Sequence, residues 1–357
     1  MRVLVTGGTG FVGSHVAVAL LAAGLNVCVL VRNEQKARQL YQSLGDKIPE
    51  IAVATVSDVV GVKQLLSQCD AVVHTAAITP MNSVSEAELF ETNVNGVKNV
   101  VGQAYELGIK KIIYLSSISA IFHTDPRMMT DDAPVVNSAH PYGKSKAEAE
   151  RYVRRLQENS PSGQSVISLY PGGIIGPQDP AMSASMMALC YRLTQGFRIT
   201  SGGTQQIDVR DLAKIVLLLL TAETKARRFL TAGHYLPWGE LADLVEKITG
   251  APLNRIESSG AFLRLVGRAY DVMRMFKTVA SPVSAETMRY ATQWPKIENS
   301  AELTRLEFSY RPLRETLIDT ISWLCQAGKI PATAAPMLQG KPKNNPDRDP
   351  NLDYTTI

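Results

Sequence analysis

The sequence lacks paired cysteines, long apolar runs and a strong excess of either charge. Its four cysteines, Cys28, Cys69, Cys190 and Cys325, lie far apart and form no CxxC pair. This spacing argues against a zinc site and against a disulfide framework, and no metal site is predicted. We expect reduced, mostly buried thiols, and therefore a protein of a reducing compartment, the cytoplasm.

Membrane-spanning and nucleic-acid-binding proteins are also poorly matched by the composition. The main candidate for a membrane span, Ile215–Leu220, is far shorter than the roughly 20 residues of a transmembrane helix. A glycine-containing strand follows Met1 directly, which is not the pattern of a signal peptide. The net charge of +4 over 357 residues is too small to indicate a nucleic-acid partner. With 45% apolar residues, the chain can bury a sizeable core.

Short apolar segments alternate with helical patterns through the first half of the chain. The expected strands cover residues 3–6, 27–31, 51–56, 70–77, 110–117 and 165–173. The expected helices cover residues 11–23, 60–68, 86–107 and 141–157. This alternation predicts an α/β fold with a doubly wound parallel sheet, the Rossmann arrangement.

The pattern divides the chain into three parts. Residues 1–173 are predicted to form the dinucleotide-binding Rossmann domain. Residues 174–330 have a less regular rhythm, and we expect a smaller, interleaved substrate-binding part with segments returning to the sheet. Residues 331–357 are polar and proline-rich, which predicts a mostly disordered tail.

A glycine-rich loop follows the first strand. Residues 8–13, "GTGFVG", fit the spacing GxGxxG between a strand and a helix. Glycine permits the tight turn and the close approach of a pyrophosphate to the helix N-terminus. We therefore expect a dinucleotide to contact Gly7, Gly10, Phe11, Val12 and Gly13.

The end of the second strand indicates which dinucleotide binds. A carboxylate there would hold the ribose hydroxyls of NAD, but the chain has Val31 followed by Arg32. A guanidinium attracts a 2′-phosphate, so we favour NADP(H), with NAD(H) as the alternative. Asp58, after the third strand, is a candidate for the adenine amino group or a simple helix cap.

A tyrosine and a lysine share one face of a predicted helix. Tyr142 and Lys146 are separated by four residues, and a serine pair, Ser116 and Ser117, ends the strand before them. A nearby ammonium favours the phenolate and makes proton transfer near neutral pH feasible. Ser117 would hydrogen-bond a substrate oxygen, with Ser116 as the alternative.

The order of these motifs resembles the extended short-chain dehydrogenase/reductase superfamily, also called the NAD-dependent epimerase/dehydratase family. The resemblance covers about residues 1–325 and is carried by TGGTGFVG (6–13), SDV (57–59), HTAA (74–77), NVNG (93–96), YLSS (114–117), YGKSK (142–146), YPGGIIGP (170–177) and DVRD (208–211).

The resemblance implies specific roles for these residues. Ser117, Tyr142 and Lys146 would be catalytic, with hydride transfer at the nicotinamide. The implied cofactor contacts outside the glycine loop are Arg32, Asp58, Val59, Thr75, Ala76, Ala77, Asn93, Ser116, Tyr142, Lys146, Pro171, Gly172 and Gly173. For Asn93 the alternative is a buried amide that ties a helix to a strand. The resemblance also implies a homodimer.

One departure from the family separates its branches. Nucleotide-sugar enzymes usually carry an arginine near the position of Thr204, and Arg198 and Arg210 do not match that position. The strand end "LVRN" instead resembles the dihydroflavonol-4-reductase-like branch. Apolar candidates for a substrate pocket are Ile78, Met81, Ile118 and Phe122, with Met182, Met186 and Met187 as further candidates or core residues.

The sequence therefore predicts an NADP(H)-dependent oxidoreductase for an apolar or aromatic small molecule, acting through a Ser-Tyr-Lys proton relay. The alternatives are an NAD-dependent sugar epimerase or dehydratase, and a non-catalytic, cofactor-binding redox sensor.

A basic amphipathic segment over residues 262–277 has no place in this chemistry. Phe262, Val266, Ala269, Met273 and Phe276 recur at helical spacing. We favour a lid or a packed surface helix, and contact with a membrane surface is the alternative.

Overall fold

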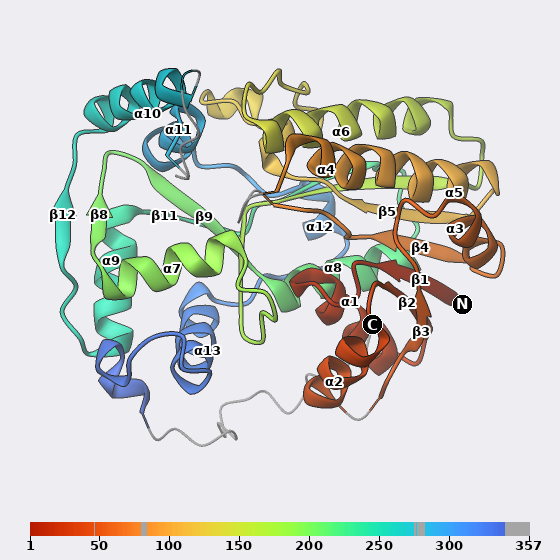
Figure 1. The fold of residues 1–357 in the computed structure, drawn as a ribbon, viewed down its shortest axis with the longest axis horizontal. Helices are drawn as coiled ribbons and strands as arrows, with labels where there is room; N and C mark the ends of the chain where they lie inside the picture. Colours follow the sequence, from red (N-terminus) through yellow and green to blue (C-terminus); the bar gives the residue numbers. More distant parts are fainter. Residues whose placement is uncertain (46, 80–83, 275, 277–282, 340–357) are drawn as a thin grey trace.

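A seven-stranded parallel sheet forms the centre of the molecule (Figure 1). The computed structural model describes residues 1–45, 47–79, 84–274, 276 and 283–339. The strand order is β10-β6-β5-β4-β1-β2-β3, and each neighbouring pair is parallel. The strands are β1 (Arg2–Thr6), β2 (Asn26–Val31), β3 (Glu50–Val53), β4 (Ala71–His74), β5 (Lys111–Leu115), β6 (Ser165–Pro171) and β10 (Arg228–Thr231). The predicted doubly wound α/β fold is confirmed.

Helices cover both faces of this sheet. One face carries α1 (Phe11–Ala22), α2 (Glu34–Leu44) and α8 (Val209–Thr221). The other carries α3 (Val59–Leu66), the helical segment from α4 (Glu86–Phe90) to α5 (Gln103–Glu106), and α6 (Pro141–Asn159). Strand β1 shows the consequence, because Val3 and Val5 pack into the first core and Leu4 into the second. Burial on both faces explains why the strands are almost continuously apolar.

The strand order reverses between β1 and β4. Strands β2 and β3 lie on one side of β1, and β4, β5 and β6 lie on the other. In doubly wound sheets ligands bind at the carboxyl ends of the strands beside such a reversal. The loops after β1, β2 and β4 meet at this point.

Two predicted elements differ from the structure in their detail. The helix expected over 86–107 contains two π-helical stretches, Glu91–Asn95 and Lys98–Gly102, between α4 and α5. The strand expected over 165–173 ends at Pro171, and β7 (Gly173–Ile175) begins a second sheet. Gly172 makes this break possible, because a Cβ there would overlap the carbonyl oxygen of Ala232.

The second half of the chain builds a smaller layer beside the sheet. Strand β7 pairs with β9 (Gly203–Asp208), which pairs with β11 (His234–Pro237), and β8 (Phe197–Ile199) pairs with β12 (Arg255–Glu257). The remaining helices are α7 (Ala184–Thr194), α9 (Trp238–Thr249), α10 (Gly260–Arg274), α11 (Ala285–Gln293), α12 (Ala301–Arg305) and α13 (Leu313–Gln326). Helix α8 and strand β10 return from this half to the central sheet.

The segment predicted to be disordered is partly folded. Short 3-10 turns cover Ala332–Ala334 and Pro336–Leu338, and the side chains of Ala335 and Leu338 are buried in the core beside α9 and α13. The prediction of a tail that begins at Pro331 is therefore wrong for residues 331–339, because two apolar side chains find a packing site. Residues 340–357 lie outside the described part of the chain.

Three sequence expectations concern features of the whole chain. All four cysteines are free thiols. Within the described residues, no helix is both long and apolar enough to cross a membrane. The same residues contain no group of three or more His, Cys, Asp or Glu side chains arranged to hold a metal ion.

Candidate active site

The glycine loop packs closely against the loop after β4 at the start of α1. Gly7 has φ +72°, and a Cβ there would lie 2.8 Å from the amide nitrogen of Ala76. A Cβ on Gly13 would overlap the carbonyl oxygen of Gly7. Helix α1 begins at Phe11 after Gly10, without a side-chain cap and without an acidic residue in its first turn. Its free N–H groups therefore fit the pyrophosphate of a dinucleotide.

A tyrosine that the sequence analysis did not single out holds this loop. The buried Tyr41 donates a hydrogen bond of 2.6 Å from its hydroxyl to the carbonyl oxygen of Gly8. Thr75 donates to the carbonyl oxygen of Thr6 at 2.7 Å, which joins the loops after β1 and β4. The signal for Tyr41 was its spacing from Ala37, since the two form the buried face of α2.

The loop after β2 presents a cation to the same region. Arg32 follows the last residue of β2, is exposed, and makes no hydrogen bond or ion pair with the described residues. Asn33 caps α2 by accepting from the amide of Lys36 at 2.8 Å. Asp58 accepts from the amide of Gly61 at 3.0 Å, so it serves as the cap of α3, and the next residue, Val59, is exposed.

Asn93 ties the loop after β4 to the helix that carries Tyr142. Its side-chain oxygen accepts from the amide of Ile78 at 2.8 Å, and its nitrogen donates to the Ile78 carbonyl at 2.9 Å. The same nitrogen donates to the hydroxyl of Ser145 at 3.1 Å. These contacts are those of a buried amide that ties two segments together, the alternative role for Asn93. It fixes Thr75, Ala76 and Ala77 relative to α6.

The serine, tyrosine and lysine come together at the carboxyl end of β5. Ser117 lies close enough to Tyr142 to lower the pKa of its phenol, and the Ser117 hydroxyl accepts from the hydroxyl of Ser119 at 2.8 Å. Lys146 donates to the carbonyl oxygen of Leu115 at 3.1 Å and is almost fully buried. Ser116, the alternative partner, has a buried hydroxyl without a hydrogen-bond partner among the described residues.

Burial dominates the acidity of these groups. It raises the pKa of the Tyr142 phenol, and the hydrogen bond with Ser117 opposes that shift. Burial also lowers the pKa of Lys146 to about 8, whereas the carboxylate of Glu150 raises it. The spacing of Tyr142 and Lys146 predicts that the lysine lowers the pKa of the phenol, but burial and Ser117 are the influences that act on the phenol in this structure.

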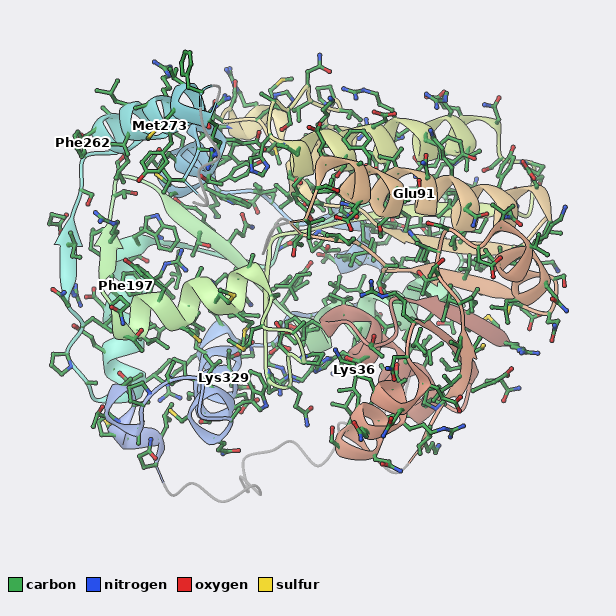
Figure 2. All side chains as sticks on the ribbon, viewed as in Figure 1. Lys36, Glu91, Phe197, Phe262, Met273 and Lys329 are labelled. Atoms are coloured by element: carbon green, nitrogen blue, oxygen red, sulfur yellow. The ribbon has the colours of Figure 1, made fainter. Side chains whose placement is uncertain are left out.

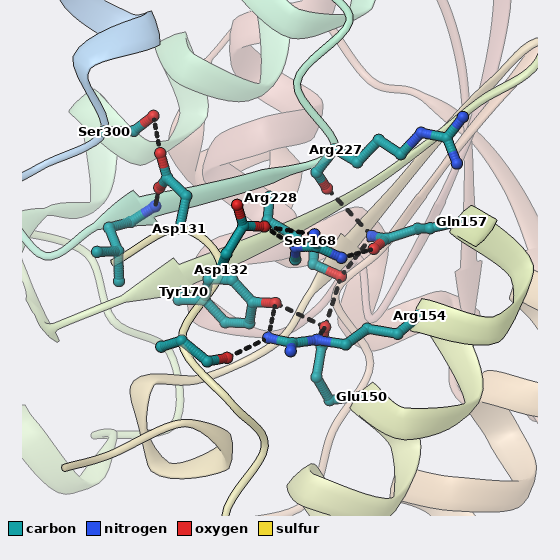
Figure 3. Close-up of polar contacts among 12 residues, drawn as sticks. Asp131, Asp132, Glu150, Arg154, Gln157, Ser168, Tyr170, Arg227, Arg228 and Ser300 are labelled. Carbon is teal, nitrogen blue, oxygen red and sulfur yellow. Dashed lines mark hydrogen bonds and ion pairs between the residues drawn. The ribbon is translucent and has the colours of Figure 1, made fainter. Parts of the chain in front are cut away.

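A polar cluster surrounds Glu150, which lies one turn after Lys146 on α6, and Figure 3 shows its contacts. Glu150 is fully buried, pairs with Arg154 at 3.2 Å and accepts from the Tyr170 hydroxyl at 2.6 Å. The cluster extends through Ser168, Gln157, Arg227, Arg228 and Asp132. Tyr142, Lys146, Glu150 and Arg154 recur every four residues, a repeat in the sequence that could have revealed the cluster.

Helix α11 is fastened to the segment just before Tyr142. Glu286 accepts from the Ser138 hydroxyl at 2.5 Å and from the amide of His140 at 3.3 Å. It also accepts from the Tyr290 hydroxyl at 2.7 Å. Tyr290 then packs against Phe122, with ring centroids 4.6 Å apart, and against Trp294. An aromatic group, Phe122, Tyr290 and Trp294, therefore lies beside the start of α6.

The apolar residues predicted to line a substrate pocket lie in different environments. Phe122 joins this aromatic group, but Ile118 is fully buried in the core below it. Met186 is a core residue of α7, Met187 is exposed, and Met182 packs against the core. Met81 lies outside the described residues.

Pro171, Gly172 and Gly173 pass beside a buried amide. Pro171 ends β6, and Gly172 is held against Ala232. A Cβ on Gly173 would meet the side chain of Gln206 at 3.7 Å. The side-chain oxygen of Gln206 is buried and has no hydrogen-bond partner among the described residues. Gln206 is thus a further polar group of this site.

Comparison with known proteins agrees with this geometry. The model of the NAD-dependent epimerase/dehydratase family matches residues 3–232, which include the glycine loop, Ser117, Tyr142 and Lys146. The chain belongs to this family. It is an NAD(P)-dependent enzyme of the extended short-chain dehydrogenase/reductase type, and its homologues act on small molecules.

Curated relatives of the chain include several reductases. Sterol demethylase protein B of Methylococcus capsulatus is 23% identical over 338 residues, 92% of this chain and 100% of its own length. Cinnamoyl-CoA reductase 1 of Arabidopsis thaliana is 29% identical over 69% of this chain and 74% of its own length. A putative dihydroflavonol 4-reductase of Synechocystis is 25% identical over 91% and 95%. These relatives support the dihydroflavonol-reductase-like branch.

Solved structures share the fold. The protein gox2253 superposes with a TM-score of 0.75 at 24% identity, covering 92% of this chain and 99% of its own. UDP-glucose-4-epimerase from Stenotrophomonas maltophila, solved with bound NAD, gives a TM-score of 0.73 at 18% identity over 92% and 99%. Reductases and epimerases therefore both occur among the proteins similar to this chain.

Proposed function

We propose that this family member is an NADP(H)-dependent oxidoreductase that interconverts a carbonyl and a secondary alcohol on an apolar or aromatic small molecule. The observation that carries the proposal is the grouping of Ser117, Tyr142 and Lys146 beside an aromatic group. NADPH would supply a hydride when bound. The residues of the site would bind the cofactor, orient the substrate and supply a proton to the substrate oxygen.

The roles of the three residues follow from their contacts. Ser117 and Tyr142 donate hydrogen bonds to the substrate oxygen, and Tyr142 delivers or removes the proton. Lys146, held by the Leu115 carbonyl, would hydrogen-bond the cofactor ribose, and Ser117 is the group that stabilises the phenolate as the proton leaves. The phenol of Tyr142 keeps its proton at neutral pH, because burial raises its pKa further above the usual value. In the reducing direction it can donate this proton to the more basic substrate oxygen that hydride addition creates.

The preference for NADP(H) rests on Arg32. Its guanidinium follows β2 and has no partner among the described residues, so it is available to a 2′-phosphate. A charge-assisted hydrogen bond of this kind contributes about 1.5–3 kcal/mol. Replacing Arg32 by Ala should therefore weaken NADPH binding by about tenfold to a hundredfold and leave NADH binding nearly unchanged.

Arg38 provides the matched control for this experiment. It lies on the next helix, is also exposed, and already pairs with Glu34 at 2.7 Å. Arg38→Ala should leave both dissociation constants unchanged. A wild-type protein that binds NADH more tightly than NADPH would contradict the preference.

An apolar or aromatic substrate fits the side chains around Tyr142 better than a sugar diphosphate. Arg210 is fully engaged by Asp208 and Asp319, and Arg198 hydrogen-bonds Ser258. No arginine occupies position 204, so the described site lacks the cation that would pair with a diphosphate. Phe122, Tyr290 and Trp294 instead offer ring faces for an apolar body. NADPH oxidation with a panel of aromatic and alicyclic ketones, compared with UDP-sugars, tests this assignment.

A further inference from the structure

Helix α10 turns an apolar stripe away from the protein. Phe262, Leu265, Val272 and Phe276, which follows the helix, are 62, 64, 55 and 83% exposed. Ala269 is also exposed and completes the spacing 262, 265, 269, 272, one continuous row along α10, and Phe276 follows beyond the end of the helix. We call these five residues the α10 stripe. The helix lies at an outer corner of the molecule, where Phe262 points outward (Figure 2).

The opposite side of α10 is the side that packs on the protein, and it is small and polar. Gly260 and Gly267 are its buried residues, and a Cβ on Gly267 would lie 2.5 Å from the carbonyl oxygen of Ser284. Asp271 accepts from the amide of Ala285 at 2.9 Å, and Arg264 donates to Thr292 at 3.0 Å. A helix on the surface of a globular protein normally shows the reverse pattern. The outward stripe thus contributes nothing to the packing of α10 on α11.

Positive charge borders the α10 stripe. Arg268 is exposed and precedes Val272 by one turn, so it borders one edge of the stripe. Within the described part of the chain, Arg268 forms no hydrogen bond or ion pair, whereas Arg264 lies on the packed side, where it donates to Thr292. The acidic residue of α10, Asp271, is engaged by Arg274 at 2.9 Å and by the amide of Ala285. The edge of the stripe is therefore cationic.

We propose that the α10 stripe docks on an anionic lipid bilayer. Within α10, Phe262 to Val272 span about 15 Å along the helix, which suits a helix lying in the plane of the interface. Phe262, Leu265, Val272 and Phe276 enter the boundary between headgroups and acyl chains, and Arg268 meets the lipid phosphates. This inference goes beyond the proposed function and does not depend on it.

A second copy of the chain is a poorer occupant of this surface. Two copies packed stripe against stripe would bring two Arg268 side chains to one seam. Asp271 is the acidic residue of α10, and its contacts with Arg274 and Ala285 are already made. Like charges without a partner oppose that arrangement, whereas anionic headgroups satisfy them.

Vesicle co-sedimentation of the full chain tests the proposal. The wild-type protein should sediment with vesicles of phosphatidylcholine and phosphatidylserine, and less with phosphatidylcholine alone. Phe262→Gln combined with Phe276→Gln should lower the partition coefficient by about thirtyfold, because two exposed rings no longer enter the lipid. Arg268→Gln should lower binding to the anionic vesicles by about fivefold and leave binding to neutral vesicles unchanged.

The matched control changes two exposed apolar residues elsewhere. Val60 and Tyr191 are 77 and 59% exposed on α3 and α7, and Val60→Gln with Tyr191→Gln should bind vesicles like the wild type. Both double variants should keep the wild-type unfolding temperature. Absence of vesicle binding, or equal binding by the Phe262/Phe276 variant, overturns the proposal. It is also overturned if light scattering shows a dimer that this variant dissociates, since a second copy would then cover the stripe.

Discussion

Replacing Glu150 by Gln should lower the pKa of Lys146, and therefore the pH above which NADPH affinity falls. Lys146 and Glu150 are one turn apart on α6, and the carboxylate raises the pKa of the lysine against the effect of burial. Inside a protein, where the effective dielectric constant is about 20, an attraction between two such charges is on the order of 2 kcal/mol. Its loss should move the pKa of Lys146 from about 8 to roughly 6.5.

The sign of the pH effect follows from which form of Lys146 binds. The ammonium predominates below its pKa and is lost as the pH rises through it, so NADPH affinity should fall above about pH 8 in the wild type. In Glu150→Gln the same fall should begin more than one pH unit lower. Fluorescence titration with NADPH across the neutral and alkaline range measures both curves, and NMR of labelled lysine side chains reports the pKa of Lys146 directly.

Glu148→Gln is the matched control for this variant. Glu148 lies on the same helix and is exposed, so its replacement should leave the curve in place. Glutamine at position 150 can still accept from Tyr170, which favours a folded variant, and circular dichroism should verify this. An unchanged pKa of Lys146 in folded Glu150→Gln would refute the electrostatic coupling.

Three further sets of substitutions test the glycine loop, the contact of Arg32 with a 2′-phosphate and the packing of residues 331–339. Gly7→Ala and Gly24→Ala both place a Cβ at positive φ, and each should lower the free energy of unfolding by about 1 kcal/mol. Only Gly7→Ala should abolish NADPH binding in a titration, because a Cβ on Gly24 would lie in open space. Arg32→Glu should reverse the NADPH-over-NADH preference in the same titration, and an unchanged ratio would remove Arg32 from the site. Leu338→Ala should lower the free energy of unfolding in urea by about 2–3 kcal/mol, whereas the exposed neighbour Met337→Ala should change it by about 0.5 kcal/mol or less; equal effects would contradict the packing of residues 331–339.

The central sheet and the dinucleotide-binding loop could be predicted because the sequence patterns that specify them involve neighbouring residues. The glycine spacing, the strand before it and the helix after it lie within 22 residues. Tyr142 and Lys146 are likewise one turn apart, and Ser117 closely follows a strand that the apolar pattern marks. Such features follow from turn geometry and helical periodicity, which depend on neighbouring residues.

What the sequence did not reveal depends on contacts between distant segments. Glu286 reaches Ser138 across 148 positions, and no local pattern announces that α11 is fastened beside Tyr142. Leu338 is a single apolar residue in a polar segment, yet α9 and α13 provide the site that buries it. Met186 is buried in the core and its neighbour Met187 is exposed, because the packing of α7 decides which face of the helix points inward.

The outward stripe of α10 shows the limit of periodicity in another way. The spacing of Phe262, Ala269 and Phe276 identified an amphipathic helix, but it did not reveal which face packs on the protein. Gly267 decides this, because its lack of a side chain lets α10 approach Ser284 closely. The small face therefore packs inward and the apolar face remains exposed.

The most direct test of the account is the behaviour of Tyr142→Phe with NADPH and a carbonyl substrate found by the wild-type enzyme. The phenol oxygen is removed while the ring and its surroundings remain, so NADPH should bind with nearly the wild-type dissociation constant. Oxidation of NADPH, followed by the absorbance of the reduced nicotinamide, should fall by about a hundredfold or more as the proton donor is lost. If folded Tyr142→Phe turns over that substrate at the wild-type rate, the phenol is not the proton donor and the proposed mechanism is wrong.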